Sequence, residues 1–245
     1  MRPIASFLSV CLVALAVVGV GCSSDDDTGP PAGSFYGLYA DAIGAHGTIT
    51  LSGVAAATAP LVLGGGPSIP LAGTLDISGE LPIVLTGLYT ESGALSFASE
   101  GDTYTFTGQV TQGTASGTST GPNGAGTFIL FTGGTPAATL VYCGEASCSP
   151  DPCETPIAFN LAVSSGTALL TAFAEGAVVS AVGTRTGDNV SIHVVSGGID
   201  VLVQGAINGP LIGGTWADNV NQTNGLWNGG TGQCSATAVR SAKTP

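Results

Sequence analysis

Apolar and polar residues alternate along most of the chain after residue 33, and this pattern limits the fold more than any other feature. In residues 103–110, Tyr104, Phe106, Gly108 and Val110 would face one way and the intervening residues the other. A period of two places one set of side chains on each face of a β-strand. No stretch beyond residue 33 has a convincing apolar period of 3.6, so the sequence predicts strands with little helix.

Short strands recur at nearly regular spacing, with glycine-rich turns between them. Spacing of this kind is typical of an antiparallel sandwich or barrel. The predicted fold class is therefore all-β. The expected strands are 47–51, 69–77, 82–90, 94–98, 103–110, 127–131, 157–163, 168–174, 178–184, 190–195, 199–205 and 211–216.

The chain also contains signs of an internal duplication. A shift of 97 residues places 106–110 on 203–207, and places Gly117-Thr118 on Gly214-Thr215. With a shift that is one residue shorter, Gly87 matches Gly183. A strand glycine marks a bend or a close approach. The sequence thus predicts two β units of similar topology, in which these glycines hold equivalent places.

The N-terminus has the form of an export signal. Arg2 precedes an apolar run over 4–20, then Gly21-Cys22 and the polar tract 23–27. A basic start, a short apolar core and small residues before a cleavage point are typical of a secretory signal peptide. The run is marginal for a transmembrane helix. An ordinary signal peptide cut elsewhere, or an uncleaved anchor, is the alternative reading.

Gly21-Cys22 and the polar tract behind it resemble the lipobox of bacterial lipoproteins. The resemblance covers about the first 27 residues and departs from the family at Gly19, where leucine is preferred. It implies that residues 1–21 are removed, that Cys22 carries the acyl chains, and that 22–33 form a flexible tether. The expected location is the cell envelope, anchored by lipid to a bacterial membrane, with the outer membrane favoured.

A cysteine cluster lies between the two predicted units. Residues 142–153 hold Cys143, Cys148 and Cys153, together with two prolines that disfavour a strand. We predict a first unit over 34–142, a connector over 143–155, a second unit over 156–238 and a tail over 239–245.

Four cysteines remain after export, and an even number in an exported chain indicates two disulfides. The predicted pairs are Cys148–Cys153 and Cys143–Cys234. Zinc is the rival interpretation, but neighbouring cysteines are not at the two-residue spacing of zinc sites and no histidine lies near them. No metal and no cofactor is expected.

Charge excludes some partners. The formal charge is −12, only 8% of residues are charged, and the basic residues are Arg2, Arg185, Arg240 and Lys243. A protein with so few cations is not suited to a phosphate backbone, so no nucleic acid partner is expected.

Few residues suggest catalysis. If the turn after residue 195 is Ser196-Gly197, His193 faces Asp200 across a hairpin; a Gly197-Gly198 turn would place Leu202 there instead. The expected role of His193 and Asp200 is an exposed cross-strand pair, and no nucleophile motif accompanies them. Convergence of Asp188 with this pair would favour a hydrolase. His46, beside Gly47, is expected to be solvated.

The two tryptophans, Trp216 and Trp227, are the candidates for ligand contact. Aromatic rings serve sugar stacking and partner binding when they are exposed. The alternative is that both rings fill the core of a small barrel left open by many glycines. Core packing is the favoured role for both.

The second half, with Tyr142-Cys143-Gly144, Gly214-Thr215-Trp216, Trp227-Asn228-Gly229 and Cys234, resembles the Gly/Thr-rich repeat domains of uncharacterised bacterial lipoproteins. The resemblance implies no activity. We expect a non-catalytic binding or structural β module on a membrane, with a cell-surface glycan or protein as partner. The alternative is a secreted hydrolase of polysaccharide or peptide.

Overall fold

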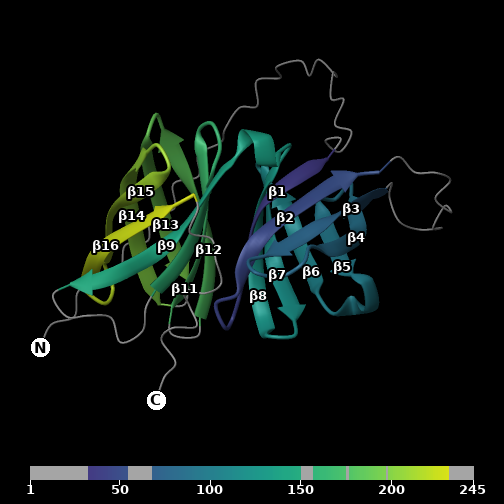
Figure 1. The fold of residues 1–245 in the computed structure, drawn as a ribbon, viewed down its shortest axis with the longest axis horizontal. Helices are drawn as coiled ribbons and strands as arrows, with labels where there is room; N and C mark the ends of the chain where they lie inside the picture. The colour runs from purple at the N-terminus through teal and green to yellow at the C-terminus, as the bar shows by residue number, and fades with distance from the viewer. Residues whose placement is uncertain (1–32, 55–67, 150–156, 175–176, 197, 232–245) are drawn as a thin grey trace, which may run out of the picture.

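The computed structural model describes residues 33–54, 68–149, 157–174, 177–196 and 198–231. These residues form two β-barrels, which Figure 1 shows beside each other. The predicted all-β class is confirmed, as is the division into two antiparallel units. The helical structure of the described residues is limited to the 3-10 turns η1 (Glu100–Asp102) and η2 (Pro136–Ala138).

The first barrel is an antiparallel meander in which each strand pairs with the next and β8 closes on β1. Its strands are β1 (Ser34–Asp41), β2 (His46–Gly53), β3 (Ser68–Ile77), β4 (Ile83–Thr90), β5 (Ala94–Ser99), β6 (Thr105–Thr111), β7 (Thr114–Gly121) and β8 (Gly124–Thr132).

The second barrel repeats the same plan, and β16 closes on β9. Its strands are β9 (Leu140–Ser149), β10 (Ile157–Val163), β11 (Thr167–Ala174), β12 (Ala177–Thr186), β13 (Asn189–Ser196), β14 (Ile199–Asn208), β15 (Leu211–Asp218) and β16 (Thr223–Gly230).

The predicted connector over 143–155 is wrong for its described part. Residues 143–149 belong to β9, which pairs with both β10 and β16. The prolines that suggested a break come only after this strand. The second barrel therefore begins at Leu140, and the short link from the first barrel runs through η2.

The two barrels share one hydrogen-bonding register, as the 97-residue shift predicts. Gly108 pairs with Gly117 between β6 and β7, and Gly205 pairs with Gly214 between β14 and β15. In each barrel the next strand carries an aromatic ring opposite the second glycine: Phe128 on β8 and Trp227 on β16. A Cβ at Gly108, Gly117 or Gly205 would overlap that ring. These glycines thus make room for an inward ring at the same place in both barrels.

The barrels meet through side chains that point outward from each. Leu38 and Phe131 of the first barrel form one buried apolar cluster with Ala162 and Leu169 of the second. The Thr127 and Ser180 hydroxyls lie 3.0 Å apart beside it. Because these outward positions are apolar and buried, the faces of β1, β8, β10 and β11 form an internal interface.

Candidate functional site

The interiors of the two barrels differ in how they are filled. In the first barrel, Phe97 stacks on Phe106 with ring centroids 4.5 Å apart, and Phe128 meets both rings edge-on. Tyr39 packs edge-on against Phe106 and Tyr104. Rings in such contact leave a dense core.

The second barrel contains a cavity of about 130 Å³. Its wall is apolar and comes from all around the barrel, and includes Ala146, Phe159, Ala172, Val194, Val203 and Trp216. Apolar cavities of roughly this size stay dry and bind molecules such as benzene. The cavity is therefore the candidate binding site of the chain.

The cavity occupies one half of the barrel. Tyr142, Val163 and Ile207 fill the end where β10 joins β11, and the Tyr142 hydroxyl donates to the Gly209 carbonyl at 3.1 Å. The cavity extends instead toward the end where β13 joins β14, since Ile157 and Ile199, at the first residues of β10 and β14, line it. It is thus closed at one end by packing.

Both tryptophans lie inside the second barrel, with only 8% and 4% of Trp216 and Trp227 exposed. The Trp216 indole donates to the Ser147 carbonyl at 2.9 Å, and the Trp227 indole lies 3.1 Å from two backbone carbonyls. The favoured core packing is observed, and neither ring forms an exposed platform. Both rings also line the cavity, so the same side chains hold the wall together and face its interior.

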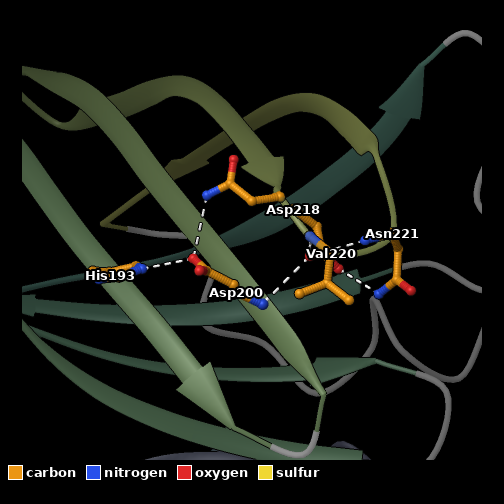
Figure 2. Close-up of polar contacts among 6 residues, drawn as sticks. His193, Asp200, Asp218, Val220 and Asn221 are labelled. Atoms are coloured by element: carbon orange, nitrogen blue, oxygen red, sulfur yellow. Dashed lines mark hydrogen bonds and ion pairs between the residues drawn. The ribbon is translucent and has the colours of Figure 1, made fainter. Parts of the chain in front are cut away.

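A polar cluster lies on β13 and β14 (Figure 2). His193 pairs in register with Leu202, as a Gly197-Gly198 turn predicts, yet its Nε2 reaches diagonally to Asp200 Oδ1 at 2.7 Å. Asn219 donates to the same oxygen at 3.3 Å. The hydrogen bond from His193 holds the pKa of Asp200 below its usual value. This is the exposed pair that the sequence predicts.

Asp218 lies beside this cluster and closes the turn after β15 (Figure 2). It is buried, and its carboxylate accepts from the Val220 amide at 2.9 Å and from the Asn221 side chain. Burial acts to raise the pKa of Asp218, but these donors outweigh it and the pKa is lowered. Its role is therefore to hold the turn between β15 and β16.

The residues proposed for hydrolysis do not converge. Asp188 lies before β13, five residues from His193 along an extended chain, or about 16 Å. His46 is buried rather than solvated, because its ring packs under the turn and Nδ1 lies 3.0 Å from the Gly44 carbonyl. Among the described residues, no group of three His, Cys, Asp or Glu could hold a metal ion.

A second hollow lies on the outer face of β12 to β15, with a volume of about 530 Å³. Hydroxyl and amide side chains border it, among them Thr184, Asn189, Gln204 and Thr215. The surface is recessed at Gly213 and Ala206, because glycine has no side chain and alanine has only a methyl group. We call this surface the outer groove.

Cys143 and Cys148 are each disulfide-bonded. They lie five residues apart on β9, about 16 Å, whereas a disulfide spans at most about 7 Å between Cα atoms. They are therefore not joined to each other. Cys153, Cys234 and Cys22 lie outside the described residues, so the predicted pairing and lipidation stay predictions.

No family model and no curated protein matches the chain. Two solved structures show a distant likeness. One is a protein of unknown function from the DUF3598 family of Nostoc punctiforme, 13% identical, covering 81% of this chain and 94% of that one, with a TM-score of 0.23. The other is the Myxococcus xanthus hemagglutinin in complex with α3,α6-mannopentaose, 15% identical, covering 80% and 99%, with a TM-score of 0.24.

At these TM-scores neither likeness bears on what this chain binds. Within the described residues, no helix is long and apolar enough to span a membrane. Three features of the second barrel could bind a ligand: its cavity, its outer groove and the polar cluster on β13 and β14.

Proposed function

We propose that the protein is a non-catalytic binding module whose second barrel holds a small apolar ligand. The observation that carries this proposal is the apolar cavity of about 130 Å³ in a barrel whose duplicated partner, in the same register, is filled by aromatic rings. A void in a core costs stability. A void that a ligand fills recovers the lost contacts.

The cavity wall indicates the class of ligand. The side chains that line it are aliphatic or aromatic, and both indole N–H groups already donate to backbone carbonyls. A polar ligand would lose its hydrogen bonds to water there without replacement. Burial of six methylene groups of a ligand contributes about 5 kcal/mol to the binding free energy, which corresponds to a Kd of roughly 0.1–1 mM.

Hexanol is a suitable first probe, because Trp216 and Trp227 are the only tryptophans of the chain and both line the cavity. Saturable binding should change the indole fluorescence and raise the melting temperature, since a ligand that binds only the folded state stabilises it. Val203→Phe introduces into the cavity the ring that Phe106 provides in the first barrel and should abolish both effects.

Leu226→Phe is the matched control. Leu226 precedes Trp227 on β16 but points outward and is exposed, so the same added ring stays outside the cavity. This variant should bind hexanol as the parent does. Unsaturable binding, or equal binding by the Val203→Phe protein, would refute the proposal.

We also propose that this module is tethered to the envelope through acylated Cys22. The apolar run ending at Gly21-Cys22 and the polar tract behind it support the proposal. Intact-mass measurement of protein extracted from membranes tests it. The expected mass is that of residues 22–245 plus acyl chains; a different unmodified N-terminus would rule it out.

The outer groove supports a second candidate, a neutral glycan. Its hydroxyl and amide side chains can exchange hydrogen bonds with sugar hydroxyls without charge. Titration of neutral oligosaccharides by calorimetry tests this candidate. Gln204→Ala should weaken any glycan binding and leave hexanol binding intact, because Gln204 points away from the cavity.

A further inference from the structure

We infer that the ligand enters the second barrel from the side, between β12 and β13, and that it is the end of an alkyl chain whose remainder stays outside. This inference rests on the proposed function, because it concerns the same cavity. It adds the route of entry and the shape of the ligand.

The first observation is an incomplete ladder. β12 and β13 pair only from Gly183–Ile192 to Thr186–Asn189, which is four residue pairs. On their other sides, β12 pairs with β11 over eight residue pairs and β13 with β14 over eight. Of the described residues, 177–182 and 193–196 thus lie on neighbouring strand edges outside this ladder. We call these two edges the seam.

The seam lies beside the cavity. Val179 on β12 and Val194 on β13 both point inward, flank the seam and line the cavity wall. The filled end of the barrel is the one where β12 and β13 are paired. β12 and β13 are therefore paired at the packed end of the barrel, and their ladder stops beside the cavity.

Exposed apolar side chains stand on the outer rim of the seam, beside the polar His193 and beside Ser180, which meets the first barrel at Thr127. Val182 on β12 is 47% exposed, Val195 on β13 is 69% exposed, and Leu202 on the adjoining β14 is 36% exposed. Exposed apolar side chains scattered singly are ordinary on a protein surface. Here the first two lie on the two edges of the seam, next to an apolar cavity, so they can contact the part of a chain that lies outside.

The size of the cavity sets the shape of the ligand. A volume of about 130 Å³ holds about as many carbon atoms as benzene. A branched or fused molecule larger than this has no room inside. An unbranched chain can place its last carbons in the cavity and continue through the seam along the valine rim.

A homologous series of n-alkanols from butanol to decanol tests the inference by Trp fluorescence. Affinity should rise about fourfold for each added methylene up to roughly hexanol, because each buried CH₂ contributes about 0.8 kcal/mol. Octanol and decanol should then bind at least as tightly as hexanol. A sharp loss of binding beyond hexanol would show a closed cavity, overturn the seam and leave the proposed function standing. Failure of every alkanol to bind would overturn both.

Substitutions on the rim test where the chain emerges. Val182→Glu and Val195→Glu should weaken decanol binding severalfold while leaving butanol binding unchanged, because only the longer chain reaches the rim. Val182→Lys should act in the same way, which separates loss of apolar contact from the sign of the charge. Leu226→Glu is the matched control, since Leu226 is equally exposed but lies on β16, across the barrel. Unchanged decanol affinity in both rim variants would overturn entry through the seam.

Discussion

The two barrels have the same strand order and the same register, yet one is packed and the other is hollow. The glycines show which residues of the two barrels hold the same place: Gly108 and Gly117 correspond to Gly205 and Gly214. Following the strand pairing from these glycines around each barrel then gives the corresponding residues on the remaining strands. The comparison therefore separates what builds the barrel from what fills it.

Several large inward side chains of the first barrel are small in the second. Phe106 corresponds to Val203 and Phe97 to Ile192, each pair facing across neighbouring strands. Tyr39, opposite Phe128, corresponds to Ala146, opposite Trp227. Leu75 likewise corresponds to Ala172, since Ile49 and Phe159 face them. The volume removed at these positions lies where the cavity is.

Other positions change in the opposite sense. Trp216 stands where the first barrel has Ser119, and Phe159 where it has Ile49. These rings partly refill the second barrel, but on one side only. The difference teaches that the glycines and the period of two maintain the barrel, while the sum of inward side-chain volumes decides whether it can hold a ligand.

Removing one ring from the packed barrel should have the largest effect. Phe106→Ala should lower the free energy of unfolding by about 3–5 kcal/mol, because Phe106 contacts Tyr39, Phe97 and Phe128. Val203→Ala, at the equivalent place, should cost only about 1–2 kcal/mol, since it removes fewer atoms from a wall that is already incomplete. Urea denaturation of both variants measures the difference, and equal losses would contradict it.

Removal of a buried carboxylate from a turn should have the next largest effect on stability. Asp218→Ala leaves the Val220 amide without its acceptor and should cost about 1–3 kcal/mol. Asp41→Ala in the first barrel should cost a similar amount, since Asp41 is buried and accepts from the Ile43 and Ala45 amides. Thermal melts compare the two, and a neutral result at either site would show that the turn finds other acceptors.

The lowered pKa of Asp218 adds a pH dependence to the second barrel. The folded state binds the proton less readily than the unfolded state, so the carboxylate stabilises the fold fully above about pH 4, the ordinary value for aspartate. That contribution to stability is lost as the pH falls through the pKa of Asp218 in the folded state. The Asp218→Asn protein should therefore show a shallower fall in melting temperature between pH 5 and 2 than the parent. Parallel curves would contradict this.

Refilling the hollow barrel should have a smaller effect of opposite sign. Ala172→Leu places at β11 the side chain that Leu75 provides in the first barrel, and should raise stability by about 0.5–2 kcal/mol by filling the cavity. The same variant should weaken hexanol binding. A variant that is more stable and still binds hexanol as the parent does would break the link between the cavity and the ligand.

The smallest effect is expected at the polar pair on β13 and β14. His193 and Asp200 are exposed, and water competes for their interaction. His193→Ala should leave the urea midpoint and hexanol affinity unchanged. A loss of binding without a loss of stability would show that this pair takes part in ligand recognition.

The sequence predicts the fold class well because inward residues of most strands are large and apolar. Four strands were not predicted: β1, β7, β9 and β16. The inward residues of β7 are Ala115, Gly117 and Ser119, and Gly117 must be small because the Phe128 ring lies over it. The cysteines of β9 and the prolines after it predict a connector over 143–155, whereas the pairing of β9 with β10 and β16 depends on distant residues.

The cavity could not be predicted from the sequence. An inward valine on one strand gives no sign of what faces it until the register of all eight strands is known. The indole positions were predicted only in part, since packing was expected but a cavity beside the rings was not. His193 and Asp200 were named correctly because a hairpin constrains both, and the two turns considered for it differ by one residue.

The interface between the barrels has a consequence for folding. Each barrel joins its first strand to its last, so closure must await nearly the whole unit, and folds rich in such distant contacts form slowly. When the first barrel closes alone, Leu38, Ile129 and Phe131 face solvent until the second covers them. A closed first barrel without the second would therefore present an apolar patch of the kind that favours aggregation, and the second barrel covers it.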